Sequence, residues 1–184
     1  MKLKISYLFI LLLTFFILSC SNDDEGDNSA TDIYIVTGLV AKSSNFSEGF
    51  LLGNPNTRMP LNFTSTSIIA YPNPVINALS IELTQTEEVI SDIYLIEAVS
   101  KKNSFQNVDF EELLTNTTYS IEEVSEASLI SFNNLSSNNI TLNLEGYNTG
   151  YYRVFIKTDS NLYWDNIYID NEGVDITEFF DSWE

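Results

Sequence analysis

The sequence predicts an all-β protein built as an antiparallel β-sandwich. Short segments in which apolar and polar residues alternate follow one another through most of the chain. Clusters of Gly, Asn, Ser, Asp and Pro separate these segments, at the spacing typical of sandwich strands. A sustained helical period of apolar residues appears at the carboxyl end, where it predicts a short amphipathic helix.

The first predicted strand is Asp32–Val40, which is rich in β-branched and aromatic residues and has Gly38 as a bulge. The segment Ala41–Asn62 contains many Gly, Ser, Asn and Pro residues and predicts a long loop or a loose hairpin. A second strand is predicted over Thr64–Ala70. Residues 32–67 therefore form an amino-terminal strand and loop region.

A proline-containing stretch precedes the main domain. Pro72 and Pro74 each fix their own φ and favour extended backbone at the residue before them. Shortly afterwards Leu79, Ile81 and Leu83 alternate with polar residues, as in a half-buried strand. The stretch is thus a rigid, extended lead-in to the first strand of this domain.

Further strands are predicted from alternation and β propensity. They are Ile90–Val99, Tyr119–Val124, Ala127–Phe132, Asn139–Glu145, Tyr151–Thr158 and Leu162–Ile169. Residues 109–114 predict one helical turn, with Asp109 as its N-cap and Glu112 reaching back. A turn is expected at 146–150, and residues 159–161 close a hairpin between the last two strands.

The tail, residues 171–184, is acidic and amphipathic. Asp175 is placed to cap a helix, with Glu178 at its third position. The apolar side chains that share one face are Ile176, Phe179, Phe180 and Trp183. We expect this face to cover a sheet of the same domain; the alternative is a docking peptide for a partner groove.

The amino terminus carries a predicted export and anchoring signal, residues 1–19. Lys2 and Lys4 precede the apolar run Ile5–Leu18, which is too short for a comfortable membrane span. The run is followed by a small residue, Ser19, and then by Cys20, the single cysteine of the chain. This ending resembles a bacterial lipobox. That resemblance implies that Cys20 is lipidated and becomes the first residue of the mature protein. More than one acyl chain gives stable anchoring.

Composition excludes several function classes. The mature chain of 165 residues has 6 basic and 26 acidic residues, and its negative field disfavours nucleic acid and anionic headgroups as partners. The chain has no His, and with Cys20 lipidated it has no free thiol. Disulfides, zinc sites and Ser-His-Asp or Cys-His catalysis are therefore not expected, and no cofactor is predicted.

Residues 20–31 form an acidic tether that begins Cys-Ser-Asn-Asp-Asp-Glu. It contains no large apolar residue, and a flexible linker is one interpretation. Its first residues also resemble the acidic export signal of surface lipoproteins in bacteria with type IX secretion. That resemblance implies display on the outer face of the outer membrane, with the periplasmic face as the alternative.

Two separated segments resemble the C-terminal sorting domain of type IX secretion. One is the stretch Tyr-Pro-Asn-Pro-Val with the strand after it, and the other is a late Gly-x-Tyr strand. The motif residues are Tyr71, Pro72, Asn73, Pro74, Val75, Gly150 and Tyr152. The resemblance covers residues 68–170 and implies an immunoglobulin-like β-sandwich without a catalytic role.

The chain departs from this family in placement. The acidic tail 171–184 follows the domain where basic residues are usual, the long segment 103–138 replaces a turn, and a lipobox stands at the other end. Our hypothesis is that the fold serves as the body of a small lipoprotein. The alternatives are a secreted or decayed type IX cargo, or a small hydrolase that uses paired carboxylates across a cleft.

Two ligand classes are candidates for the domain. Calcium prefers several carboxylate and carbonyl oxygens, and the candidate ligands are Asp165, Asp170, Glu172 and Asp175. The favoured interpretation of these residues is a solvated acidic loop without a metal site. Aromatic rings exposed on one face could stack on sugars, but an aromatic-rich sheet with half its rings buried is the favoured interpretation; these rings belong to Tyr147, Tyr151, Tyr163, Trp164 and Tyr168. The sequence thus predicts a non-enzymatic, lipid-anchored outer-membrane protein that acts through a protein or glycan partner.

Overall fold

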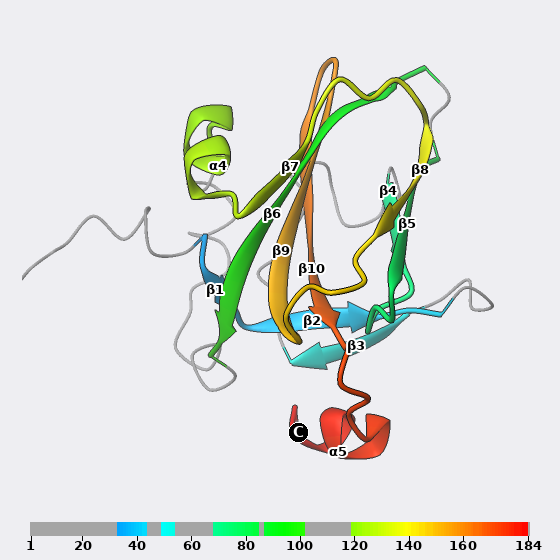
Figure 1. Ribbon diagram of the computed structural model, residues 1–184, viewed down its shortest axis with the longest axis vertical. Coiled ribbons are helices and arrows are strands. Elements are labelled where there is room, and N and C mark those ends of the chain that lie inside the picture. The colour runs from blue at the N-terminus through cyan, green and yellow to red at the C-terminus, as the bar shows by residue number, and fades with distance from the viewer. Residues whose placement is uncertain (1–32, 44–48, 54–67, 85–86, 102–118, 184) are drawn as a thin grey trace, which may run out of the picture. The chain divides into compact units, whose positions relative to one another are not determined.

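A computed structural model of the chain gives the fold (Figure 1). The residues that it describes are 33–43, 49–53, 68–84, 87–101 and 119–183. Every described residue belongs to one compact unit, Thr31–Glu184.

Strands dominate the described part, so the predicted all-β class is confirmed. The strands are β1 (Ile35–Val36), β2 (Gly38–Ala41), β3 (Phe50–Gly53), β4 (Ile68–Tyr71), β5 (Ala78–Leu83), β6 (Ile90–Ser100), β7 (Ile130–Phe132), β8 (Asn139–Asn143), β9 (Gly150–Thr158) and β10 (Leu162–Ile169). Two short helices accompany them, α4 (Ile121–Ala127) and α5 (Ile176–Asp181).

The strands of the described part form three sheets. The largest has the order β1-β6-β9-β10, with β7 added to β6; the second has the order β4-β5-β8; the third is the hairpin β2-β3. Pairing is antiparallel except between β1 and β6. The two larger sheets bury their facing side chains in one common core.

That core follows from the period of two in each strand. Leu79, Ile81 and Leu83 of β5 point inward, as their alternation predicts. They meet apolar residues of β6, β9 and β10, among them Val154 and Ile156. Burying one such side chain completely stabilises the fold by about 1.5–3 kcal/mol.

The opposite face of the largest sheet is also covered. Helix α4 packs Val124 against Tyr94, Phe155 and Trp164. Helix α5 and the β2-β3 hairpin cover the rest of this face, where Phe179 joins a second small cluster. Strands β9 and β10 are therefore buried on both faces.

Most predicted strands are present, but one region was predicted wrongly. Residues 119–124, expected as a strand, lie mainly in helix α4, and the strand expected over 127–132 is reduced to β7. The cause is a capping box, in which Ser120 and Glu123 each bond the other's backbone N–H. The helical turn expected at 109–114 lies outside the described residues.

The amino-terminal and carboxyl-terminal regions have the expected character. The predicted strand at 32–40 is divided into β1 and β2, with Gly38 opening β2. Within 41–62, where a long loop or a loose hairpin was predicted, the described residues include β3, which pairs with β2. Helix α5 is capped by Asp175, and Phe179 and Trp183 are buried against the same unit. Ile176, however, is 47% exposed.

Candidate functional site

The proline motif connects β4 to β5, which share one sheet, and between them it reaches the edge of the larger sheet. Tyr71 ends β4, which pairs with β5. Four residues later, the Val75 N–H donates to the Tyr168 carbonyl (2.7 Å) and the Asp170 N–H donates to the Val75 carbonyl (2.8 Å). Val75 is fully buried and bridges β10 in parallel, so the motif closes the open edge of the larger sheet. The peptide bonds before Pro72 and Pro74 are cis.

Asn73 is the most extensively hydrogen-bonded residue of this motif. Its side-chain Nδ2 donates to the carbonyls of Val40 and Asn166, both at 2.9 Å, and its Oδ1 accepts from the Tyr168 N–H at 3.0 Å. Its backbone N–H and C=O both pair with Lys42, at 2.8 Å. The side chain is 2% exposed. Asn73 therefore ties β2 and β10 to the proline motif.

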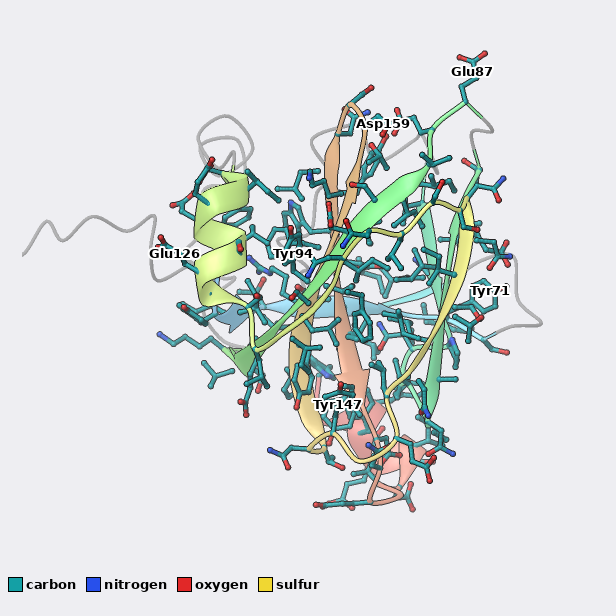
Figure 2. The ribbon with its side chains drawn as sticks, turned by 45° about the horizontal axis from the view of Figure 1, so that its top comes forward. Tyr71, Glu87, Tyr94, Glu126, Tyr147 and Asp159 are labelled. Atoms are coloured by element: carbon teal, nitrogen blue, oxygen red, sulfur yellow. The ribbon has the colours of Figure 1, made fainter. Side chains whose placement is uncertain are left out.

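The side chain of Tyr71, unlike the buried side chain of Asn73, lies on the outer face of the sheet β4-β5-β8 (Figure 2). Its hydroxyl donates to Glu82 Oε1, and Asn139 Nδ2 donates to the same oxygen at 3.2 Å. The hydrogen bond to Glu82 is the largest of the causes that raise the pKa of Tyr71. This row of polar side chains crosses all three strands of the sheet.

Gly150 and Tyr152 lie at the start of β9. The Tyr152 hydroxyl donates to the Asn148 carbonyl at 2.9 Å, across the turn that precedes the strand. The ring is 1% exposed, and burial raises the pKa of the hydroxyl. The two halves of the predicted motif do not converge on one exposed site, because Asn73, Val75 and Tyr152 are all buried.

A buried polar network was not predicted from the sequence. Arg153 has no exposed surface; its Nε donates to Asn166 Oδ1 (3.1 Å), and its Nη2 donates to the Ile35 carbonyl (2.6 Å). Its Nη1 donates to the Tyr119 hydroxyl at 2.6 Å, and the guanidinium lies 4.6 Å from the Trp164 ring centroid. The network joins β9 to β1, to β10 and to Tyr119, which immediately precedes the N-cap of α4.

A second buried charge lies next to this network. Asp165 is 5% exposed, and Lys42 Nζ lies 3.4 Å from its Oδ2. Burial raises the pKa of Asp165, and the attraction of Lys42 opposes that rise. The carboxylate also accepts the N–H of Asn166 at 2.9 Å.

The four calcium candidates have separate roles. Asp165 pairs with Lys42, Asp170 accepts the N–H groups of Gly173 and Val174, and Asp175 caps α5. Glu172 is exposed. Within the described ranges, no group of three or more His, Cys, Asp or Glu side chains is placed to hold a metal ion.

The aromatic candidates for sugar stacking do not share an exposed face. Tyr163 is buried in the core between the two larger sheets, and Trp164 lies on the opposite face under α4. Tyr151 and Tyr168 pack beneath α5, with ring centroids 4.8 Å apart. Tyr147 is partly buried against the common core. These rings serve the packing of both faces.

The sequence features that point to a membrane fall outside the described residues. These features are Cys20 and the acidic tether. Neither helix of the described part has the length and apolar character needed to cross a bilayer.

Comparisons with protein-family models, curated proteins and solved structures found no match to this chain.

Proposed function

We propose that this protein is a lipid-anchored outer-membrane or cell-surface protein that acts by binding or assembly and has no enzymatic activity. The observation that carries the proposal is the position of Cys20, directly after an apolar run and directly before an acidic tether. Lipidation at Cys20 would fix the amino-terminal end at the membrane. The domain that begins near residue 31 would then be presented on that tether.

For the domain itself, we propose an immunoglobulin-like β-sandwich. If β4, β5 and β8 are taken as strands A, B and E, then β6, β9 and β10 take the places of C, F and G. The hydroxyl of Tyr152, at the start of the strand in position F, bonds a carbonyl four residues upstream. Both the strand order and this tyrosine corner are typical of immunoglobulin-like domains.

The resemblance to a type IX sorting domain gains support from the positions of its motif residues. The proline motif forms the connection from the A position to the edge of the G strand, and the Gly-x-Tyr segment supplies the tyrosine corner. Because Asn73, Val75 and Tyr152 are buried and bond other strands or turns, we propose that these motif residues preserve the fold. The binding surface would then lie elsewhere on the domain.

The test is protease shaving of intact cells that express the full chain, combined with mass spectrometry of Cys20. We expect an acylated Cys20 and rapid loss of the domain from intact cells. Replacement of Cys20 by Ser should move the protein out of the membrane fraction, whereas Ser21→Ala should not. A lipidated but protected domain would place it on the periplasmic face.

The competing proposals give different results in the same experiment. A secreted cargo would appear free in the medium, without lipid and cleaved near Tyr71. That outcome would refute the anchored-protein proposal. A small carboxylate hydrolase would have to show turnover that is lost on replacing two acidic residues facing one cleft.

A further inference from the structure

Strand β8 leaves one edge of its sheet unpaired by any described strand. It bonds β5 on one side, and no other described strand follows it in the order β4-β5-β8 (Figure 1). Two hydrogen bonds show which β8 residues direct their backbone groups toward β5. The Leu83 N–H donates to the Asn138 carbonyl (2.8 Å), and the Leu144 N–H donates to the Asn77 carbonyl (2.6 Å). Backbone direction alternates along a strand, so Asn139, Thr141 and Asn143 direct their N–H and C=O groups outward.

The residues that carry these outward groups are at the surface: Asn139, Thr141 and Asn143 are all exposed. The Ser137 hydroxyl accepts a hydrogen bond from the Asn139 N–H at 3.2 Å and donates one to the Asn139 carbonyl at 2.7 Å. This contact is itself at the surface and can exchange for a strand-to-strand bond. Thr141 stands at the middle of the edge.

The sequence of β8 is chemically palindromic. It reads Asn-Ile-Thr-Leu-Asn, with an amide at each end, a branched aliphatic residue on each side of the centre, and Thr141 at the centre. When a second copy of β8 pairs with it in antiparallel orientation, each residue therefore faces a residue of the same chemical type. Such self-complementarity is what a two-fold interface requires.

The edge is also free of charge in a strongly acidic chain. No Asp, Glu, Lys or Arg occurs between Glu126 and Glu145, although the chain has 26 acidic residues. Two copies of such a chain repel each other over most of their surface. They can approach where neither carries charge, and β8 lacks the Lys or Pro that commonly protects an edge strand.

The other edge of the same sheet, formed by β4, is less suitable, because Ile68 and Ala70 are buried there. Strand β4 is followed directly by Pro72, which has no N–H, and by the proline motif. Alternation leaves only Ile68 and Ala70 of β4 with backbone groups that point away from β5. At the edge of the larger sheet, β10 is bridged by Val75.

We propose that β8 is a self-association edge, at which a second copy of this chain pairs antiparallel about a two-fold axis through Thr141. The two sheets then join into one sheet with the order β4-β5-β8-β8-β5-β4. Thr141 faces its own copy, and Asn139 faces Asn143 of the second copy. These uncharged pairs each contribute little, as expected for a weak and reversible dimer. The pairing does not depend on the lipid anchor.

Cysteine crosslinking tests this register. The chain has one cysteine, so Thr141→Cys adds a single new thiol. In the proposed dimer of Thr141→Cys, the two new thiols would lie opposite each other, whereas those of Asn143→Cys would be separated by about 14 Å along the strands. A mixture of Asn139→Cys and Asn143→Cys chains restores a facing pair. Ser125→Cys, on exposed α4, is the control for random collision.

The full chain is crosslinked on cells and again after purification in detergent, with a short thiol-reactive reagent. We expect Thr141→Cys and the Asn139→Cys/Asn143→Cys mixture to crosslink several-fold more than Asn143→Cys alone or Ser125→Cys. Peptide mass spectrometry separates these links from any through Cys20. Adding Thr141→Lys to both chains of the mixture should abolish the link, because it places like charges at the axis.

Two results would overturn the proposal. One is crosslinking of Thr141→Cys no greater than that of Ser125→Cys, together with a monomeric mass for the unmodified chain by light scattering in detergent at all concentrations. The other is a link from Thr141→Cys to a different polypeptide, which would assign the edge to a foreign strand. Because the purified chain is tested separately from cells, failure of dimerisation is distinguishable from failure of lipid anchoring.

Discussion

At the scale of single residues, Asn73 explains why the proline motif needs an asparagine. Both side-chain N–H groups and the side-chain oxygen are used inside the protein, and the three bonds reach two strands that are distant in sequence. An aspartate of the same shape would direct a carboxylate at the carbonyls of Val40 and Asn166. A buried amide whose hydrogen bonds are all made contributes more to the stability of the fold than its apolar contacts alone would.

Replacement of Asn73 by Ala should therefore destabilise the protein by roughly 2–4 kcal/mol, since three buried partners lose their hydrogen bonds together. Urea denaturation of the purified full chain measures this loss. Asn138→Ala, at an exposed position, is the matched control and should change stability by less than about 0.5 kcal/mol. A loss for Asn73→Ala as small as that of the control would show that the network does not stabilise the fold.

The environment of Arg153 was only partly predictable from the sequence. Alternation places it correctly on the face of β9 opposite Tyr152 and Val154. That face is nevertheless buried, because α4, α5 and the β2-β3 hairpin cover it. The guanidinium of Arg153 bonds the Ile35 carbonyl and the Tyr119 hydroxyl there. The bonding partners of Asn73 lie as far as 95 positions away and could not be inferred from the sequence.

At the scale of elements, strands with a clear period of two were predicted well. Strands β5, β6, β9 and β10 agree with their predicted ranges to within one residue at each end. Helix α4 was missed because the apolar residues of a single short helix can also be matched to a strand. The signal that would have identified it is Ser120 followed by Glu123, a capping box at the correct spacing.

The cap of α4 offers a direct test at this scale. Ser120→Ala removes the hydroxyl that accepts the Glu123 N–H and should destabilise the protein by about 1 kcal/mol. Ser125→Ala, further along the exposed side of the helix, removes a hydroxyl without a capping role and should have a much smaller effect. Urea midpoints of the two variants make the comparison. Equal midpoints would mean that α4 does not depend on its cap.

At the scale of the whole molecule, charge is distributed very unevenly. The described part contains four Lys and Arg residues, and two of them, Lys42 and Lys157, form ion pairs with Asp165 and Asp92. Arg153 is buried. In the part of the chain that the structure describes, few positive charges are therefore left to offset the acidic residues. Two copies of such a chain repel each other, which agrees with the proposal that they pair at the uncharged edge of β8.

This distribution predicts how stability responds to pH. Burial raises the pKa of Asp165 above its usual value of 3.8, so the folded protein takes up a proton at a higher pH than the unfolded chain. The stability that this group contributes is full below pH 3.8 and is lost as the pH rises through the folded-state pKa. Asp92 acts in the opposite direction. Its desolvation is outweighed by hydrogen bonds and by the charge of Lys157, which together lower its pKa, so its contribution is lost only at more acidic pH.

Asp165→Asn removes the first of these effects and leaves the second. Relative to the unmodified protein, this variant should gain stability as the pH is raised from about 4 to 8, because it has no buried carboxyl to ionise. Urea unfolding of both proteins at several pH values in this range measures the difference. Asp159→Asn, on the exposed tip of the β9-β10 hairpin, controls for loss of one negative charge from the whole molecule (Figure 2). If Asp165→Asn instead lost stability relative to the unmodified protein as the pH rose, the ion pair with Lys42 would outweigh the burial of Asp165, and β2 would be held to β10 mainly by charge.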